Sequence, residues 1–256
     1  MEMYFRKNQI AMKLFCYALL ASMMLALTSC DKSDDDSPAN NPSANPSLNL
    51  SFRFQVDGPA LQFDTIAYEN EAHNHYSVHT LEFYISQLSL VKSDNSTVAV
   101  KDWIYVDARE TSTLDVVIKN IPKGCYTGMT FNIGIDSAHN VQDGLPATPA
   151  NLMMEWPGAM GGGYHFIKLE GYFADSSGTP GYAMHIGTNS CLIPVQLPVS
   201  ICFDNADVSR TLVANINEWF RNPETYDLNI DGNYIMGNMA AMSKFAANGA
   251  DVFTLQ

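Results

Sequence analysis

The feature that most constrains the fold is the strict alternation of apolar and polar residues between Leu48 and Val56. In this stretch, LNLSFRFQV, every second side chain is large and apolar, and Asp57-Gly58 follows it. A two-residue period is typical of a strand with one buried face and one solvated face. The pattern therefore predicts an antiparallel strand of a layered β domain, closed by a turn.

Similar short apolar runs, separated by Asn, Gly or Pro, continue along the chain. In residues 81–90 the alternation slips by one position, which predicts a β-bulge near Gln87. Residues 235–246 place apolar side chains at helical spacing ahead of Gly249, a residue suited to a helix C-cap. Further strands are expected at 98–106, 114–118, 129–135, 164–173, 182–186, 193–203 and 208–216, with a helix as the alternative for the last. The chain is thus predicted to be mainly β, an antiparallel β-sandwich with a short C-terminal helix.

The first 29 residues have the pattern of an export signal. Three basic residues precede the apolar run 14–27, which is too short for a stable transmembrane span. Leu27-Thr28-Ser29-Cys30 then matches a lipobox, so Cys30 is the expected lipidation site, with an ordinary signal peptide as the alternative. Residues 30–47 are acidic and then rich in Pro, Asn and Ser, a composition that predicts a disordered tether. We therefore expect an outer membrane lipoprotein of the cell envelope, facing the periplasm or the medium, with its folded domain at 48–256.

Composition and motifs argue against two classes of function. The chain has a formal charge of −13, and removal of residues 1–29, which contain three bases and one acid, takes it to −15. Nucleic-acid binding requires a basic surface, so it is not expected here. The sequence contains no nucleophile elbow, HExxH motif, phosphate loop or dinucleotide fingerprint, so we expect no enzymatic activity.

Three cysteines follow Cys30 in the chain: Cys125, Cys191 and Cys202. Disulfides persist in an oxidising envelope compartment. Cys191 and Cys202 flank a Pro-containing stretch and are candidates for a disulfide, which would leave Cys125 free. The alternative is that all three are small buried apolar groups.

The stretch MMEWPGAMGGGYHFIKLEG, residues 153–171, indicates the wall of a binding site. If a strand starts at Tyr164, His165 shares a face with Ile167 and turns inward. A buried imidazole needs hydrogen bonds or a metal to satisfy its nitrogens. Gly161-Gly162-Gly163 would let the backbone pass close to a bulky group, or would serve only as a flexible turn.

His185 lies on the next predicted strand, which only the loop 174–181 separates from the first. The two strands can pair as a hairpin, in which opposed side chains lie within about 5.5 Å of each other. Two imidazoles at that distance can share one ion, and copper accepts both imidazole and thioether ligands. Thioethers are supplied nearby by Met153, Met154, Met160 and Met184, although Met more often fills gaps in a core. Each histidine has the same ordinary alternative, a core residue satisfied by hydrogen bonds.

The segment HNHYSVH is a second histidine cluster, with His73, His75 and His79 on one face if the chain is extended. That arrangement would make a surface patch able to bind metal. A polar loop ahead of a strand is the more ordinary interpretation.

The order of several short motifs resembles the MbnP-like family of methanobactin-associated copper proteins, which is related to the surface copper proteins MopE and CorA. The most specific motif is GYHFIKLEG at 163–171. The other matching segments are LSFRF at 50–54, LEFYIS at 81–86, FNIGIDS at 131–137, MEW at 154–156, HIG at 185–187 and NEWF at 217–220. Together they span most of residues 48–256.

This resemblance implies an extracytoplasmic β-sandwich that binds copper. In the family, a Trp oxidised to kynurenine forms the copper site with histidines, and a di-haem peroxidase of the MauG type performs the oxidation. Carried over to this sequence, the resemblance makes Trp156 the expected kynurenine and His165 and His185 the expected ligands. Further candidate ligands are His139 and Met184. The alternative is a surface lipoprotein that acts as a binding or scaffold module without metal.

Overall fold

The computed structural model describes residues 45–256. The predicted signal peptide at 1–29, the lipidation site Cys30 and most of the tether at 30–47 lie outside these residues. The end of the predicted tether is packed, because Pro46 is buried and its carbonyl accepts a hydrogen bond of 2.8 Å from the Ile121 backbone. The packed domain therefore includes residues before Leu48. Within 45–256, no helix combines the length and apolar character needed to cross a membrane.

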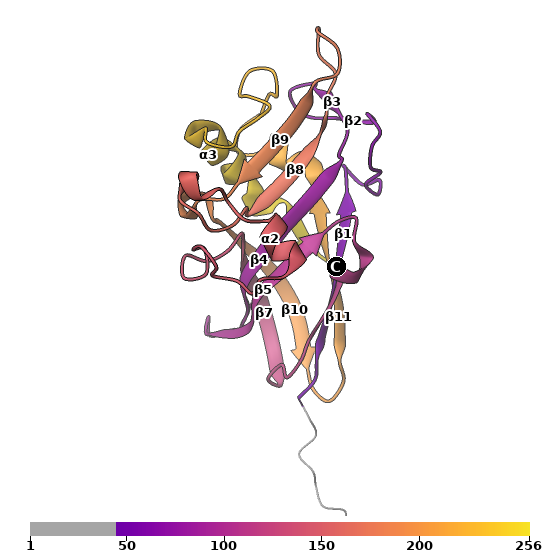
Figure 1. The fold of residues 1–256 in the computed structure, drawn as a ribbon. Coiled ribbons are helices and arrows are strands. Elements are labelled where there is room, and N and C mark those ends of the chain that lie inside the picture. Colours follow the sequence, from indigo (N-terminus) through magenta and orange to yellow (C-terminus); the bar gives the residue numbers. More distant parts are fainter. Residues whose placement is uncertain (1–44) are drawn as a thin grey trace, which may run out of the picture. The chain divides into compact units, whose positions relative to one another are not determined.

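Two β-sheets form a sandwich (Figure 1). The six-stranded sheet has the order β10-β7-β4-β8-β9, with β5 paired to β4. Its strands are β4 (Thr80–Val91), β5 (Thr97–Asp107), β7 (Gly124–Ile133), β8 (Ile167–Tyr172), β9 (Gly181–Ile186) and β10 (Ile193–Phe203), all paired antiparallel. The four-stranded sheet has the order β12-β11-β1-β6. It consists of β1 (Leu48–Gln55), β6 (Asp115–Ile118), β11 (Val208–Asn215) and β12 (Phe253–Leu255).

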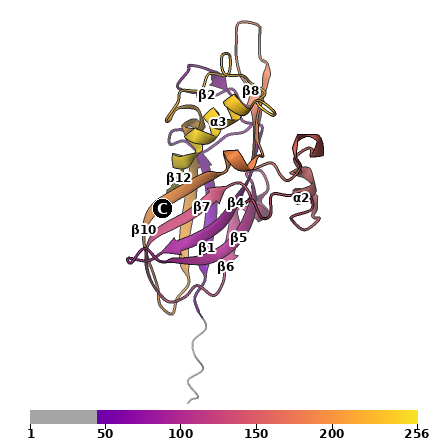
Figure 2. The same ribbon diagram turned by 90° about the vertical axis from the view of Figure 1, so that its left-hand side faces the viewer.

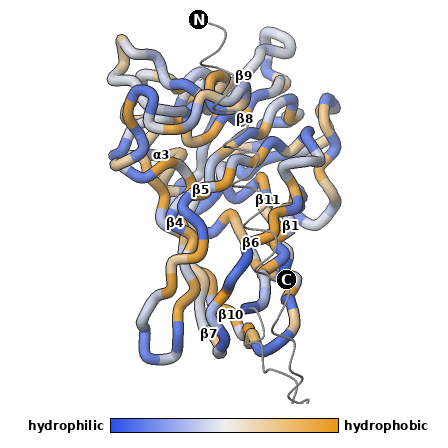
Figure 3. The backbone as a smooth tube through the Cα atoms, turned by 60° about the horizontal axis from the view of Figure 1, so that its bottom comes forward, coloured by the Kyte–Doolittle hydropathy of each residue, from blue (hydrophilic) through white to orange (hydrophobic). Residues whose placement is uncertain are grey.

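This architecture confirms the predicted β-sandwich. Hydrophobic and hydrophilic residues alternate along the backbone (Figure 3). One pairing differs from the all-antiparallel expectation, because β1 and β11 run parallel. Residues 208–215 are a strand, not a helix, since β11 pairs with β1 along its whole length. A small additional sheet is made by β2 (Tyr68–Glu69) and β3 (His75–Tyr76).

The predicted bulge in β4 is confirmed. Gln87 has a φ of 54°, in the left-handed region, and the pairing of β4 with both β5 and β7 shifts register within residues 86–89. An extra residue at this point turns the apolar positions back to the same face. Leu88 and Leu90 are therefore buried, as are Leu81 and Phe83 before the bulge.

The C-terminal helix is α3 (Met239–Ala247), and a shorter helix, α2 (Pro149–Met153), precedes β8. The cap of α3 differs from the prediction, because Asn248 takes the C-cap position in a right-handed conformation. Gly249 is instead needed for packing, since a Cβ atom there would lie 2.6 Å from the Trp219 ring. Short 3-10 helices occur at Thr111–Thr113, Gly158–Met160, Asn189–Cys191, Ile216–Phe220 and Asn248–Asp251.

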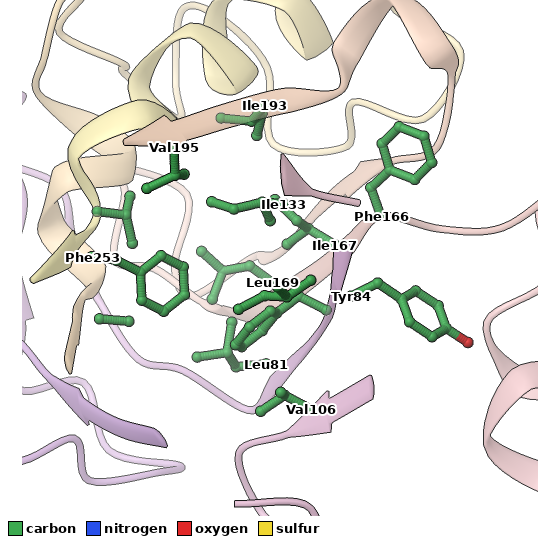
Figure 4. Close-up of a cluster of buried hydrophobic side chains, with 14 of the residues drawn as sticks. Leu81, Tyr84, Val106, Ile133, Phe166, Ile167, Leu169, Ile193, Val195 and Phe253 are labelled. Atoms are coloured by element: carbon green, nitrogen blue, oxygen red, sulfur yellow. The ribbon is translucent and has the colours of Figure 1, made fainter. Parts of the chain in front are cut away.

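The two faces of the six-stranded sheet differ. The inner face carries Leu169 from β8 and packs on the four-stranded sheet, with the Phe83 and Phe253 rings 5.7 Å apart. Tyr84 and Phe166 point away from this cluster (Figure 4). On the outer face, the Tyr84 hydroxyl donates a 2.7 Å hydrogen bond to Asn151 of α2. The helix α2 thus covers the outer face, while α3 lies on the other side of β8 (Figure 2).

The disulfide joins Cys125 and Cys202, so the predicted Cys191–Cys202 pair is wrong. Cys125 on β7 and Cys202 on β10 are directly opposed in the antiparallel register, with Cα atoms 4.0 Å apart. Cys191 is buried and forms no disulfide with any residue between 45 and 256. Sheet register therefore decided the pairing across 77 residues of sequence.

Candidate metal centre

The β8–β9 hairpin places His185 on the outer face of the six-stranded sheet. In its register, His185 opposes Lys168 and Met184 opposes Leu169. Directly opposed side chains of antiparallel strands lie on the same face. His185 therefore shares the face of Lys168 and Glu170, while Met184 lies in the core. The face that carries the charged side chains of β8 therefore also carries this histidine.

His165 comes to the same place by a different route. Strand β8 begins only at Ile167, not at Tyr164, so the alternation of the strand does not extend back to His165. The prediction that His165 shares a face with Ile167 is wrong for this reason. The rings of His165 and His185 lie 5.0 Å apart, centre to centre, at an interplanar angle of 90°. The structure thus brings these two histidines together, with His165 only 6% exposed.

A tight loop carries His165 back against Trp156. The backbone N–H of Trp156 donates to the carbonyl of Gly163 at 2.8 Å, and that of His165 donates to the carbonyl of Met154 at 2.6 Å. Between these two bonds, Gly161, Gly162 and Gly163 have φ values of 108°, 71° and 89°. Three successive left-handed residues are accessible at low cost only to glycine. The glycine triplet is therefore the turn that closes the loop.

Asn140 fastens this loop to β9. Its side-chain oxygen accepts a 2.8 Å hydrogen bond from the Tyr164 backbone, and its amide donates to the carbonyl of Gly187 at 3.1 Å. A Cβ atom on Gly163 would overlap the Asn140 side chain, so a glycine is required there. One buried amide thus sets the spacing between the segments that bear His165 and His185.

The hydrogen bonding of His165 fixes its tautomer. Its Nδ1 lies 3.1 Å from the carbonyl oxygen of Met154, which can only accept, so Nδ1 carries the proton. Burial, and after it the charge of the neighbouring His185, lowers the pKa of His165 from 6.5 to about 4. A ring that is neutral at physiological pH and protonated on Nδ1 keeps a lone pair on Nε2.

His185 is oriented by a carboxylate. Its Nε2 lies 2.7 Å from Oε1 of Glu170, while Thr80 donates to Oε2 of the same carboxylate at 3.0 Å. The hydrogen bond from His185 is the main cause that lowers the pKa of Glu170. An ionised carboxylate only accepts, so His185 donates from Nε2 and its lone pair, when the ring is neutral, is on Nδ1.

Trp156 forms the third wall of the site. Its ring centre lies 4.8 Å from that of His165, and the residue is 1% exposed. The indole rests on Gly187, where a Cβ atom would overlap its six-membered ring. Its Nε1 is buried and has no hydrogen-bond partner among residues 45–256. Leaving such a group unpaired costs about 1–3 kcal/mol, which marks the position as unusual.

The arrangement fits a metal ion held by two imidazoles. Rings that share one ion through nitrogens about 2 Å from it lie roughly 5 Å apart, centre to centre. In His165 and His185, one ring nitrogen is bound to an oxygen acceptor and the other has no hydrogen-bond partner within the described residues. Within 45–256, no three His, Cys, Asp or Glu side chains are grouped so that they could hold a metal. The centre therefore offers two imidazole ligands and an adjacent indole.

The other two predicted ligands, His139 and Met184, have different surroundings. His139 pairs with Asp136 at 2.8 Å, and its side chain is 44% exposed. Met184 lies on the opposite face of the sheet, fully buried in the core, so it does not reach the histidines. In the segment 73–79, His73 binds Glu69 and His79 binds Asp64, each at the surface.

Three residues that shape the site were not singled out by the sequence: Asn140, Glu170 and Gly187. Glu170 had a usable signal, because its side chain falls on the His185 face once β8 and β9 pair. Gly187 lies two residues after His185 in the motif HIG and could have been noticed as a close approach. Asn140 had no such signal, since its contacts join three separate segments.

The fold and the site together define a class, an extended β-sandwich with two histidines and a tryptophan clustered outside one sheet. The chain belongs to the MbnP family, whose model matches residues 45–240. Among solved structures, MbnP from Methylosinus trichosporium is similar, with a TM-score of 0.53 over 82% of this chain and 98% of that chain. The two sequences are 12% identical, so this likeness shows the fold alone. No curated protein matches the chain.

Proposed function

We propose that this protein binds copper in the cell envelope through His165 and His185. The observation that carries the proposal is the 5.0 Å approach of two imidazoles, each with one nitrogen already bound to an oxygen acceptor. Membership of the MbnP family supports the same function, because the family is associated with copper. Among divalent first-row ions, copper binds nitrogen ligands most strongly, which makes it the expected occupant.

Two acceptors orient the proposed ligands. The Met154 carbonyl holds His165 by Nδ1, and the Glu170 carboxylate holds His185 by Nε2. Such partners fix the tautomer and the direction of a metal-binding imidazole and increase its basicity. Because His165 is kept neutral by burial, no proton has to be displaced from it at physiological pH before a metal binds.

The test is metal uptake by the purified protein. We expect about one copper per chain, and we expect the double variant His165→Ala/His185→Ala to lose it. The matched control is His73→Ala/His79→Ala, which removes two exposed histidines and should keep the full stoichiometry. Equal copper in both double variants would refute the assignment.

Trp156 is proposed to be converted to kynurenine by a di-haem peroxidase of the MauG type. Its support is local: the indole touches His165, is buried, and has an unpaired Nε1. Two equivalents of hydrogen peroxide, the oxidant of a peroxidase, would cleave the C2–C3 bond of the indole and leave as water, and hydrolysis would then release C2 as formate. The product carries a ketone and an aromatic amine beside the ligands. Intact mass after co-expression with a di-haem peroxidase tests this, with Trp156→Phe as the control. An unchanged mass of the unsubstituted protein would contradict the modification.

The envelope location is proposed to depend on lipid attachment at Cys30, followed by the tether to residue 47. Its support is the lipobox in the sequence. Fractionation of cells should place the protein with the outer membrane, and Cys30→Ser should release it from that fraction. Membrane association of the Cys30→Ser protein would show that the anchor lies elsewhere.

One observation favours the alternative of a binding module without metal. Tyr172 and Tyr234 are 53% and 65% exposed and flank a hollow of about 310 Å³. Exposed aromatic faces beside a shallow hollow suit a sugar ring or an apolar side chain. Binding to envelope glycan that is lost in Tyr172→Ala/Tyr234→Ala and unaffected by copper would favour this function.

A further inference from the structure

Three methionines are exposed at the protein surface on segments that adjoin the histidine centre. Met160, Met236 and Met239 are 37%, 44% and 45% exposed, and we call them the methionine rim. They come from two segments, the loop that carries Trp156 and the turn before α3. Large apolar side chains left in water together need an explanation, whereas single ones do not.

The turn before α3 runs along the edge of β9. Tyr234 forms a parallel bridge with Ala183, and the Ile235 backbone donates to the Ala183 carbonyl at 3.3 Å. Along this segment, Tyr234 and Met236 are exposed while Ile235 is buried. Paired residues of a bridge share a face, and alternate residues along each strand do too. Tyr234 therefore lies on the face that carries His185, and Met236 follows it as the second residue of the turn 235–238.

Met160 reaches the same turn from the other segment. Its Cε atom lies 3.2 Å from the point where Gly237 would have a Cβ atom, so the side chain rests on the turn itself. Met236 precedes Gly237, and Met239 begins α3 two residues later. A bond of 2.8 Å from the Asn238 backbone to the Ile235 carbonyl closes the turn and holds both methionines on it.

The chemistry of the rim is that of a soft ligand set. Thioether sulfur is neutral and polarisable and selects soft ions such as copper(I). Lys244 and Asp231, the charged residues closest in sequence to the turn, bind each other at 2.7 Å. Neither charge is therefore left to favour a hard cation at this position.

We propose that the methionine rim is a second metal site, which binds a soft monovalent ion such as copper(I) at the edge of β9. The inference deepens the proposed function, because the rim takes Met160 from the loop that carries Trp156 and would hold an ion at the edge of the strand that bears His185. The inference rests on the proposed copper site only for the place to which the ion would pass from the rim. Binding at the rim itself requires no histidine.

The experiment titrates the purified protein with silver(I), a redox-inert probe for soft sites, and counts bound ions by native mass spectrometry. The test variant is Met160→Leu/Met236→Leu/Met239→Leu, in which leucine keeps the apolar bulk. The control is Met153→Leu, which removes a methionine that is 68% exposed and outside the rim. We expect the triple variant to bind one silver ion fewer than the unsubstituted protein, and the control to bind the same number.

The histidine variants separate this inference from the copper site. His165→Ala/His185→Ala should retain the silver ion of the rim, whereas the triple methionine variant should retain copper at the histidines. Full silver stoichiometry in the triple variant overturns the rim and leaves the histidine site untouched. If the triple variant does not fold, Met236→Leu alone should weaken silver binding by about tenfold, as loss of one of three ligands implies. Unchanged affinity in that single variant overturns the proposal equally.

Discussion

The histidines of residues 73–79 and the pair His165 and His185 differ mainly in their surroundings. His73 and His79 have side chains 87% and 58% exposed, and each binds a surface carboxylate. His165 is 6% exposed, and the His185 side chain is 17% exposed. All four have an acceptor on one ring nitrogen, but only the buried pair faces a second imidazole.

The difference shows what burial adds to a hydrogen bond. At the surface, a histidine bound to a carboxylate gains little, because water screens the contact and can replace either partner. In the buried pair the same contact leaves one defined nitrogen for another ligand, because no solvent reorders the ring. Loop 73–79 thus has more histidines than the centre at β8–β9, but lacks the orientation that a metal site requires.

The largest difference between the buried and the exposed histidines should be their effect on stability at acidic pH. The folded pKa of His165, about 4, is below its ordinary 6.5, so between these values the unfolded chain binds a proton that the folded chain refuses. Stability should therefore be complete above pH 6.5, fall as the pH drops towards 4, and flatten below that. The loss should be up to about 3 kcal/mol. Urea unfolding between pH 7 and 5 covers about 2 kcal/mol of this loss. That range lies above the ordinary pKa of carboxyl groups, although burial raises the pKa of Glu82.

The pH experiment is controlled with two variants. His165→Asn removes the titrating buried ring, and His79→Asn removes a ring at the surface. His165→Asn should flatten the decline between pH 7 and 5, and His79→Asn should leave it as it is. An equally steep decline in both variants would assign the effect to other groups.

Gly187→Ala should come next in size. The added methyl group would overlap the indole of Trp156, and forcing such a group into a packed site costs about 1–3 kcal/mol. Thermal unfolding measures the loss, and tryptophan fluorescence should shift as the ring is displaced. Gly158→Ala, in the loop that carries Trp156, is the matched control, since nothing lies within 4 Å of its Cβ position. Equal stability of the two variants would show that the close approach is not required.

Glu170→Gln tests orientation without removing a ligand. Loss of a carboxylate that orients a metal-binding imidazole typically lowers the metal affinity by about 10- to 100-fold. Competition with a copper chelator measures the affinity. Glu69→Gln, which changes the carboxylate bound to exposed His73, should leave it unaltered. If Glu170→Gln retains full affinity, His185 does not depend on its carboxylate for alignment.

The smallest change in stability is expected from substitution of an exposed histidine in residues 73–79. His73→Ala should change the free energy of unfolding by no more than about 0.5 kcal/mol, because exposed ion pairs contribute little. Chemical denaturation at neutral pH measures this. A loss as large as that of Gly187→Ala would contradict the division between the two groups.

Much of the sandwich could be predicted from the chain because strand patterns are local. The alternation of residues 48–56 and the slip at Gln87 both appear as expected in β1 and β4. The meeting of His165 and His185 was also predictable, since only a short loop separates β8 from β9. The reason given for it was incomplete, because the true start of β8 moves His165 off the face of Ile167.

The features that could not be predicted from the sequence depend on the pairing register between segments that are distant in the chain. Cys125 opposes Cys202 only because β7 and β10 are neighbours, a fact no local spacing contains. Met184 seemed available as a ligand until pairing with Leu169 placed it in the core. Asn140 acts through bonds to two other segments, and its importance is visible only in three dimensions.

The histidine centre lies outside the six-stranded sheet, beneath the segment that links β7 to β8, and not between the two sheets. One wall of it, the β8–β9 hairpin, belongs to the hydrogen-bonded framework, and the other wall is a glycine-closed loop bonded to the side chains of Asn140 and Lys168. Substitutions in that loop can therefore change the surroundings of the two histidines while the strand pairing of the sandwich stays as it is.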